Sequence, residues 1–491
     1  MSGMTLPATA AKFGVAELLA ATGGVAHALP ADGSAAEGVS TDSRTIARGE
    51  LFVALAGPRE QPVRTVLDGH RFLGDALRRG AWGVLVEEQA LLREDVASEL
   101  AVWPGRAVIV VPDSLRALGD LAAYHRRRMP ARIVGITGSN GKTTTKEMTF
   151  AIAAERWRVL RNEGNLNNLV GLPLTLLGLD GGHEVAVVEM GMNHAGEIRR
   201  LAAIAAPQVG VVTNIGPVHL EGVGGLAGVA AAKAEILEGI APGGTAVLNA
   251  DDPATPGLAA RWDGNVITFG LSAAADARAE EIESSPQGTA FTLVLAGSGR
   301  AHVRMSWLGE HNVRNALAAA AAASCLGADC AQIGAGLLRA RPAAMRFEIG
   351  TFPPGVTVVN DAYNANPASM RAALSAFAQL PAASRRALVL GDMLELGMTA
   401  PAEHHELGRD AARTAPALLL AVGAFAERIA EGARAGGLSA SAIETVPDAE
   451  AAARLLSGWL RPGDLLLLKG SRGVRLERIL DRLRATGGGS R

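Results

Sequence analysis

The chain contains the stretch IVGITGSNGKTTT, which runs from Ile133 to Thr145 and passes from an apolar run into a glycine-rich turn and then a helical pattern. The backbone amides of such a turn form a concave nest at the start of a helix, which favours phosphate. Lys142 would reach the outer phosphates of a nucleotide, and Thr143 would present a hydroxyl to Mg²⁺. Because Ile136 stands where the usual pattern has a glycine, the loop is a shortened variant of a phosphate-binding loop.

Short apolar runs alternate with helix-length stretches on both sides of this loop, which predicts an α/β fold with parallel sheets covered by helices. Strands are predicted at residues 51–55, 83–86, 107–111, 132–136, 185–189, 209–213, 246–249, 356–360, 387–390, 417–422 and 464–469. Residues 279–304 show β-type alternation and predict a peripheral hairpin region. The most apolar window, residues 316–328, is mostly alanine and too short to span a bilayer, so it predicts a buried helix, which we place at residues 313–326.

Two breaks divide the 491 residues, which correspond to about three domains of roughly 150 residues. The first is the run Arg126–Pro130, where proline ends a helix whose charged end is expected to face solvent. The second is Arg341-Pro342. We therefore predict domains at residues 1–130, 131–341 and 342–491.

The composition excludes several classes of protein. Hydrophobic residues make up 48% and charged residues 20%, a balance that supports buried cores and excludes a disordered chain. The net charge of −2 provides no basic field for nucleic acid or an anionic membrane. Two cysteines cannot form a disulfide framework in a chain of this length, which fits a reducing, cytoplasmic compartment. Glu17 and a glycine pair interrupt the apolar stretch 13–29, so we expect no cleaved signal peptide.

Lysine is scarce in this chain. Of the 47 basic residues, 42 are arginine and five are lysine: Lys12, Lys142, Lys146, Lys233 and Lys469. A compact ammonium and a planar guanidinium are not interchangeable at a site, so the remaining lysines are candidate functional residues.

Polar residues follow several of the predicted strands, at the edge where α/β sheets bind ligands. Glu189 ends one strand and could hold Mg²⁺ at nucleotide phosphates, although it could also be a surface carboxylate. His219 follows the next strand as a possible metal ligand or phosphate contact, and Lys233 lies in the helix after it. Asn312 could bind a ligand or simply cap the alanine-rich helix. Arg346 could hold a phosphate between domains, or merely a carboxylate.

These motifs resemble those of a known family. The loop Thr137–Thr144 is similar to the ATP loop of the Mur ligases and folylpolyglutamate synthases, and Ser40–Arg44 with Leu51–Leu55 looks like the N-terminal uridine-nucleotide domain of the Mur ligases. The remaining segments resemble the branch of the Mur ligases that adds a dipeptide: Gly164–Asn168, Glu189–Ile198, His219–Gly222, Asn360–Pro367, Gly391–Gly397 and Lys469–Arg472.

The resemblance implies a UDP-sugar-binding domain, a central P-loop ATPase domain and a C-terminal Rossmann-like domain. It also implies a monomeric cytoplasmic enzyme of peptidoglycan precursor synthesis that uses ATP and Mg²⁺. ATP would phosphorylate the terminal carboxylate of UDP-N-acetylmuramoyl-tripeptide, whose third residue is diaminopimelate or lysine. The amine of D-alanyl-D-alanine would then attack the acyl phosphate and expel phosphate.

The resemblance also implies roles for individual residues. ATP would contact Gly138, Ser139, Asn140, Gly141, Lys142, Thr143 and Thr144, with Asn312 at adenine and Arg346 and Asp361 at phosphate and ribose. Metal ligands would be Thr143 and Glu189 for one Mg²⁺, and His219 with a carbamylated Lys233 for a second. Substrates would contact Thr41, Asp42, Ser43, Arg44, Asn165, Asn167, Asn168, Tyr363, Asn364 and Asn366.

Two segments depart from the family pattern. Residues 57–65 form a longer and more basic link than usual, and Ala344-Met345-Arg346 replaces the Pro-Gly-Arg of many relatives.

Four other readings are less well supported. The preceding ligase of the family, which adds diaminopimelate or lysine, typically carries Asp-Asn-Pro-Arg, and this chain has no such tetrapeptide. Folylpolyglutamate synthases lack the N-terminal uridine-type domain. A GTPase switch would need Asn-Lys-x-Asp, which none of the five lysines fits. Lys142, Glu189 and His219 argue against a non-catalytic relative.

Overall fold

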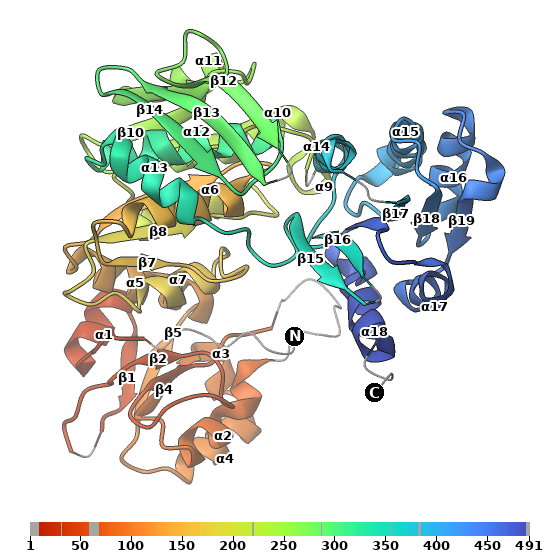
Figure 1. Cartoon of the computed structure of the whole chain (residues 1–491). Coiled ribbons are helices and arrows are strands. Elements are labelled where there is room, and N and C mark those ends of the chain that lie inside the picture. Colours follow the sequence, from red (N-terminus) through yellow and green to blue (C-terminus); the bar gives the residue numbers. More distant parts are fainter. Residues whose placement is uncertain are drawn as a thin grey trace.

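The computed structural model describes residues 9–30, 32–57, 68–218, 220–285, 287–353, 355–381 and 384–487. These residues form three sheets in consecutive parts of the chain, each mainly parallel and flanked by helices (Figure 1). The predicted α/β class is confirmed. The predicted domain limits near residues 130 and 341 fall between consecutive sheets.

The N-terminal sheet has the order β1-β5-β4-β3-β2, and only its edge strand β1 is antiparallel. Its strands are β1 (Val25–Ala28), β2 (Val39–Ser40), β3 (Leu51–Val53), β4 (Gly83–Glu87) and β5 (Ala107–Val111). The helices of this part are α1 (Val15–Thr22), η1 (Gly69–Phe72), α2 (Leu73–Arg78), α3 (Glu88–Leu91), α4 (Glu94–Ala101) and α5 (Ser114–Arg127). The unexplained segment 57–65 lies outside the described residues from position 58 onward.

The central sheet has nine strands in the order β14-β13-β12-β11-β10-β9-β6-β8-β7. They are β6 (Arg132–Thr137), β7 (Val159–Arg161), β8 (Val185–Glu189), β9 (Val209–Val212), β10 (Thr245–Asn249), β11 (Asn265–Gly270), β12 (Ala277–Ser285), β13 (Gly288–Leu295) and β14 (Gly299–Met305). Strands β6 to β12 pair in parallel, and β12, β13 and β14 pair antiparallel. The predicted peripheral hairpin is therefore three strands that continue this sheet at its edge.

Helices cover both faces of the central sheet. They are α6 (Lys142–Ala153), α7 (Gly171–Leu176), α8 (Glu197–Ala205), α9 (Leu220–Val223), α10 (Leu226–Glu238), α11 (Thr255–Ala259), α12 (Glu310–Cys325) and α13 (Cys330–Arg339). One buried cluster packs α6, α12 and α13 against the sheet, and the predicted buried alanine helix is confirmed as α12. The other face, with α7, α8 and α10, belongs to a cluster that continues through α5 into the N-terminal sheet.

The C-terminal sheet has the order β15-β16-β20-β17-β18-β19, and only β15 is antiparallel. Its strands are β15 (Glu348–Phe352), β16 (Val356–Asp361), β17 (Arg386–Gly391), β18 (Leu418–Val422), β19 (Ile443–Val446) and β20 (Leu465–Lys469). Its helices are α14 (Pro367–Gln379), η2 (Gly397–Thr399), α15 (Ala400–Ala412), α16 (Ala426–Ala435), η3 (Ala440–Ala442), α17 (Ala449–Trp459), η4 (Arg472–Val474) and α18 (Glu477–Gly487). In Figure 1 this unit lies beside the central unit, with α14 toward α9.

The charged end of α5 does not simply face solvent, contrary to the prediction. Arg126 is 6% exposed, and its Nε donates to the carbonyl oxygen of Ala205 at 3.0 Å. Burial lowers the pKa of this guanidinium. The charge is tolerated because it satisfies the carbonyl end of α8, where a cation is favoured by the helix dipole. This contact joins the N-terminal and central units.

Candidate active site

The phosphate-binding loop needs glycine at two positions. Gly138 has φ 143° and Gly141 has φ 78°, both in the region that side chains rarely adopt. A Cβ on Gly138 would overlap the side chain of Thr213, and a Cβ on Gly141 would overlap that of Asn315. The loop can therefore lie this close to its neighbours only with glycine at both positions.

The loop is held by the polar turn after β9, in which the sequence predicted a functional role only for His219. The backbone amide of Asn140 donates to Asn214 Oδ1 at 3.0 Å, and Thr213 Oγ1 donates to the Asn140 carbonyl at 2.6 Å. Ser139 Oγ donates to the Gly216 carbonyl at 3.0 Å. These bonds fix the amides of the loop before any ligand arrives. The polar pair Thr-Asn directly after a buried strand was the available sequence signal.

Lys142 opens helix α6 and folds back over the loop. Its Nζ donates to the carbonyl oxygens of Gly138 at 2.8 Å and Ser139 at 3.2 Å. Burial lowers the pKa of Lys142, the Glu189 carboxylate opposes that shift, and Arg346 adds to it. The ammonium therefore lies among the groups expected to handle phosphate.

Glu189 ends β8 and is 2% exposed, so the surface reading of this residue is wrong. Thr143 Oγ1 donates to its Oε2 at 2.7 Å, and Asn167 Nδ2 donates to its Oε1 at 2.7 Å. Burial alone would raise the pKa of Glu189, but the charges of Lys142 and Arg346 and the bond from Thr143 bring it below its usual value. The carboxylate is therefore held ionised.

The oxygen atoms of Thr143 and Glu189 are the kind of donors that Mg²⁺ prefers. Among the described residues, no cluster of three or more His, Cys, Asp or Glu side chains could hold a metal alone. Mg²⁺ typically takes one or two protein oxygens and completes its shell with phosphate and water. His219 lies outside the described residues. Lys233 is 1% exposed, and burial together with the Lys142 charge lowers its pKa well below the usual value.

The C-terminal unit brings Arg346 to this centre. Its guanidinium lies 4.1 Å from the ring centroid of Tyr363, and its charge acts on both Lys142 and Glu189. The flanking residues Met345 and Phe347 have φ of 59° and 54°. The left-handed backbone at Met345 is a conformation that glycine adopts more readily than other residues.

Asp361 is fully engaged within the protein. Its Oδ1 accepts from the amide of Phe347 at 3.1 Å, and its Oδ2 pairs with Lys469 Nζ at 2.6 Å. Lys469 is 2% exposed and also donates to the carbonyl of Asn364 at 3.2 Å. In this arrangement Asp361 anchors the turn that carries Arg346.

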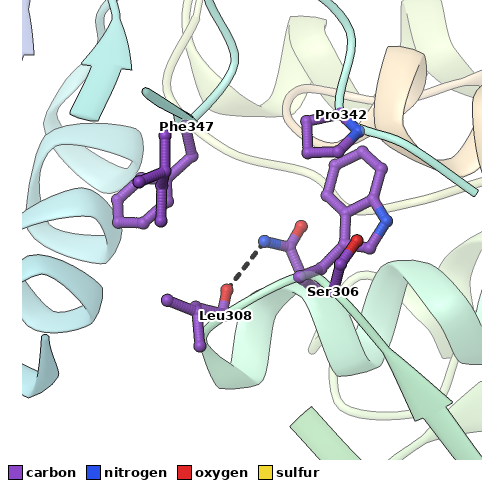
Figure 2. A pocket seen from close by; sticks show the side chains of 7 residues that line it. Ser306, Leu308, Pro342 and Phe347 are labelled. Carbon is purple, nitrogen blue, oxygen red and sulfur yellow. Dashed lines mark hydrogen bonds between the residues drawn. The ribbon is translucent and has the colours of Figure 1, made fainter. Parts of the chain in front are cut away.

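A cavity of about 210 Å³ opens where the central unit joins the C-terminal unit (Figure 2). It is lined by Ser306, Trp307, Leu308, Asn312, Pro342, Phe347 and Ile349. Helix α12 begins after Gly309, so Asn312 is not its N-cap. Asn312 Nδ2 instead donates to the Leu308 carbonyl at 2.8 Å, and Asn315 donates to Asn312 Oδ1. This small, mostly apolar cavity with one amide suits a flat heterocycle.

A second cavity of about 190 Å³ lies between the phosphate loop and the C-terminal unit. Its walls are Ser139, Lys142, Pro217, Val218, Asn364, Ala365, Asn366, Leu394, Glu395, Leu396, Ser471, Arg472 and Gly473. Asn366 caps α14 by accepting from the Ser369 amide at 2.9 Å, and its Nδ2 donates to Asn140 Oδ1 at 2.7 Å. Asn366 thus ties the C-terminal unit directly to the loop.

Other predicted substrate residues lie in more exposed surroundings. Asn165 and Asn168 are exposed, and Asn168 Oδ1 accepts from the amides of Val170 and Gly171 at the start of α7. In the N-terminal unit Arg44 is exposed and its guanidinium pairs with Asp42 at 2.6 Å, while Thr41 is half-buried and Ser43 buried. None of Thr41, Asp42, Ser43 and Arg44 lines either of the two cavities described above.

Comparison with known families and structures agrees with this architecture. A family described as "Mur ligase middle domain" matches residues 136–323, and one described as "Mur ligase, glutamate ligase domain" matches residues 345–472. The chain is 35% identical to a UDP-N-acetylmuramoyl-tripeptide–D-alanyl-D-alanine ligase of Bacillus subtilis, over 90% of this chain and 92% of that protein. It is 36% identical to the ligase of the same name from Escherichia coli, over 92% and 94%.

Solved structures show the same three-domain arrangement. The crystal structure of MurF from Acinetobacter baumannii superposes with a TM-score of 0.83 at 34% identity, covering 98% of this chain and all of that one. MurF ligase from Thermotoga maritima in complex with ADP superposes with a TM-score of 0.76 at 28% identity, covering 91% and 97%. Within the described residues, no helix is long and apolar enough to cross a membrane.

Proposed function

The chain belongs to the Mur ligase family, and on this premise we propose that it joins D-alanyl-D-alanine to UDP-N-acetylmuramoyl-tripeptide at the expense of ATP, which becomes ADP. The relatives at 35–36% identity carry that name over nearly their whole length. The reaction would supply a peptidoglycan precursor in the cytoplasm, and through it cell-wall growth, cell shape and division. The enzyme would act as a monomer on small-molecule substrates.

The observation that carries the proposal is the convergence of three charges on one centre: the buried Glu189 and the half-buried Lys142 and Arg346. Lys142 and Glu189 come from the central unit, and Arg346 comes from the C-terminal unit, yet each influences the pKa of another member of the set. A phosphoryl group carries negative charge while it is being transferred, and two neighbouring cations can stabilise that charge. The cavity beside Lys142 is walled by both units, so a reacting group there would be enclosed on two sides.

ATP binding would use the 210 Å³ cavity and the phosphate-binding loop. The heterocycle would enter the 210 Å³ cavity beside Asn312, and the phosphates would lie on the loop from Gly138 to Thr144. Mg²⁺ would be held by Thr143 and Glu189, with a second ion at His219 and a carbamylated Lys233; such ions supply charge neutralisation at the phosphates. Asp361 would contribute by anchoring Arg346, in addition to any contact with ribose.

The chemistry then follows in two steps. A carboxylate oxygen of the tripeptide attacks the γ-phosphorus, the bond to ADP breaks, and an acyl phosphate forms. The amine of D-alanyl-D-alanine attacks the acyl carbon, gives up its proton, and phosphate departs with the former carboxylate oxygen. Lys142 and Arg346 would stabilise charge on the transferred group. Contacts between the loop and the C-terminal unit, such as Asn140 with Asn366, would limit the access of water to the acyl phosphate.

The three predicted domains would divide the work. Residues 1–130 would bind the UDP-sugar through Thr41, Asp42, Ser43 and Arg44, and residues 131–341 would bind ATP. Residues 342–491 would bind the dipeptide near Tyr363, Asn364 and Asn366. Asn165, Asn167 and Asn168 would contact the peptide of the UDP-sugar substrate near Glu189.

The direct test measures phosphate release from ATP by the purified protein with Mg²⁺ and UDP-N-acetylmuramoyl-tripeptide, with D-alanyl-D-alanine added or withheld. We expect release that requires the dipeptide and a product heavier by one dipeptide unit. Release only with UDP-N-acetylmuramoyl-dipeptide and a diamino acid would move the assignment one step earlier. No phosphate release with either pair of substrates would contradict ligase activity.

A further inference from the structure

The scarcity of lysine directs attention to Lys146, which the proposed reaction does not use. Lys146 lies one turn into α6 and is 0% exposed, the most buried lysine of the chain. Burying an ammonium is costly unless it is paired and hydrogen-bonded, so such a residue normally has a specific task. Arginine is used almost everywhere else in this chain.

The ammonium of Lys146 has two partners. Its Nζ donates to the carbonyl oxygen of Asn162 at 2.6 Å and pairs with Glu147 Oε1 at 2.9 Å. Glu147 also pairs with Arg161, the residue before Asn162. The charged network therefore fixes the backbone of α6 to the chain that leaves β7.

Asn162 passes this restraint on to Glu189. Its Oδ1 accepts from the amide of Glu189 at 2.9 Å, and its Nδ2 donates to the carbonyl of Glu189 at 3.1 Å. The same Nδ2 also donates to the carbonyl of Leu166 at 2.9 Å, which shapes the loop that carries Asn167. Asn167 in turn holds the Glu189 carboxylate. One amide side chain thus fixes both the backbone of Glu189 and the loop that orients its side chain.

We propose that Lys146 and Asn162 are positioning residues that set the direction of the Glu189 carboxylate toward the divalent cation. Neither residue touches the reacting groups. A compact ammonium fits between the Asn162 carbonyl and Glu147, whereas the wider guanidinium of arginine needs more space than a fully buried site provides. This inference rests on the proposed function, because it assigns to Glu189 the role of a metal ligand.

The test compares Lys146→Met, Lys146→Arg and Asn162→Ala with the unaltered protein. Two quantities are measured: the Mg²⁺ concentration that gives half-maximal turnover, and the binding of Mn²⁺ to the enzyme–ADP complex by electron paramagnetic resonance. Loss of groups that orient a metal ligand typically weakens metal binding by 10–100-fold. We expect about tenfold weaker binding in all three variants, with turnover largely recovered at high Mg²⁺.

The matched control is Thr149→Val, because Thr149 is also fully buried in α6 but bonds only to the carbonyl of Thr145, at 2.7 Å. This variant should keep the metal dependence of the unaltered protein. The double variant Lys146→Met/Asn162→Ala should bind Mn²⁺ with the same affinity as the single variant that binds it less tightly. The two losses should not add, because both residues act on Glu189 through the same chain of contacts.

The outcomes distinguish a failure of this inference from a failure of the proposed metal site. Folded Lys146→Met and Asn162→Ala proteins that bind Mn²⁺ as the unaltered protein does would overturn the inference and leave the proposed function intact. If Lys146→Met fails to fold, Asn162→Ala decides the question: weaker Mn²⁺ binding in this variant supports the inference, and unchanged binding overturns it. An unaltered protein that neither binds Mn²⁺ with ADP nor needs Mg²⁺ would overturn the metal site itself, and the inference with it.

Discussion

In the proposed reaction, Lys142 is the residue on which phosphoryl transfer should depend most directly. Its ammonium is held over the loop by two carbonyls and has Glu189 and Arg346 as charged neighbours. We expect Lys142→Ala to lower dipeptide-dependent phosphate release by at least about a hundredfold, because a preorganised charge at the transferred group is lost. The exposed Lys12 provides the control, and Lys12→Ala should keep full activity. A Lys142→Ala protein with near-normal turnover would contradict this role.

The depressed pKa of Lys233 makes a separate prediction. Carbamate forms from a neutral amine and CO₂, and burial together with the Lys142 charge lowers the pKa of Lys233, so a larger fraction of this amine is neutral than of an ordinary lysine at the same pH. We therefore expect a carbamate carbon signal when the protein is incubated near pH 7 with ¹³C-bicarbonate. The signal should vanish in Lys233→Arg, because a guanidinium does not titrate in this range. A bare amine at Lys233 under saturating CO₂ would count against the modification.

At the scale of elements, the turn between β6 and α6 is the most constrained connection of the site. Gly141→Ala adds a methyl group that meets the Asn315 side chain and forces alanine to φ 78°. We expect the variant to bind ADP at least about fivefold more weakly, because a loop shift of this kind costs more than about 1 kcal/mol. Gly437→Ala is the control: its φ is 92°, but no atom lies within 4 Å of the added carbon. Calorimetry that finds equal ADP affinity in both variants would refute the constraint.

The elements themselves show what local sequence can and cannot predict. The buried parallel strands, such as Val185–Glu189, were found because continuous apolar runs between helical stretches are typical of them. Strands β1, β2, β7, β11, β15 and β19 were missed, because each is short or mostly half-exposed and lacks a continuous buried run. Strands β12 to β14 were correctly read as β but not as part of the central sheet, because pairing partners depend on the tertiary fold.

For the whole molecule, the two domain limits predicted from the sequence differ in how much buried apolar packing crosses them. Leu118 and Leu121 of α5 share a buried cluster with Leu172 and Leu201 of the central unit. Leu308 is the one central residue in the two clusters of the C-terminal unit among the described residues. The C-terminal unit therefore has its own core, whereas the first two units share one cluster in addition to a separate cluster within each of them.

This difference predicts how isolated segments behave. A segment of residues 342–491 should fold alone and unfold cooperatively on heating, because its core is nearly complete. A segment of residues 1–130 should expose the apolar face of α5 and bind a hydrophobic dye such as ANS. Circular dichroism and dye fluorescence check both statements. A cooperative, dye-free 1–130 segment would show that the shared cluster is dispensable.

The site was only partly predictable for a related reason. Lys142 and Thr143 follow a glycine-rich turn, and Glu189 ends an apolar strand. Both are local patterns that can be recognised in the sequence itself. The bond from Asn366 to Asn140 joins residues 226 positions apart, and the pair of Asp361 and Lys469 spans 108. Such contacts depend on how the units pack. The sequence could therefore suggest that these residues are functional, but it could not show that they form contacts with distant residues of the same chain.

The central claim is that an acyl phosphate forms between the two units, and oxygen transfer tests it most directly. UDP-N-acetylmuramoyl-tripeptide labelled with ¹⁸O in its terminal carboxylate is incubated with enzyme, ATP, Mg²⁺ and D-alanyl-D-alanine, and the released phosphate is analysed by mass spectrometry. The proposed chemistry predicts one ¹⁸O atom in each phosphate, because phosphate departs with the former carboxylate oxygen. Phosphate without label, formed alongside the peptide product, would contradict it.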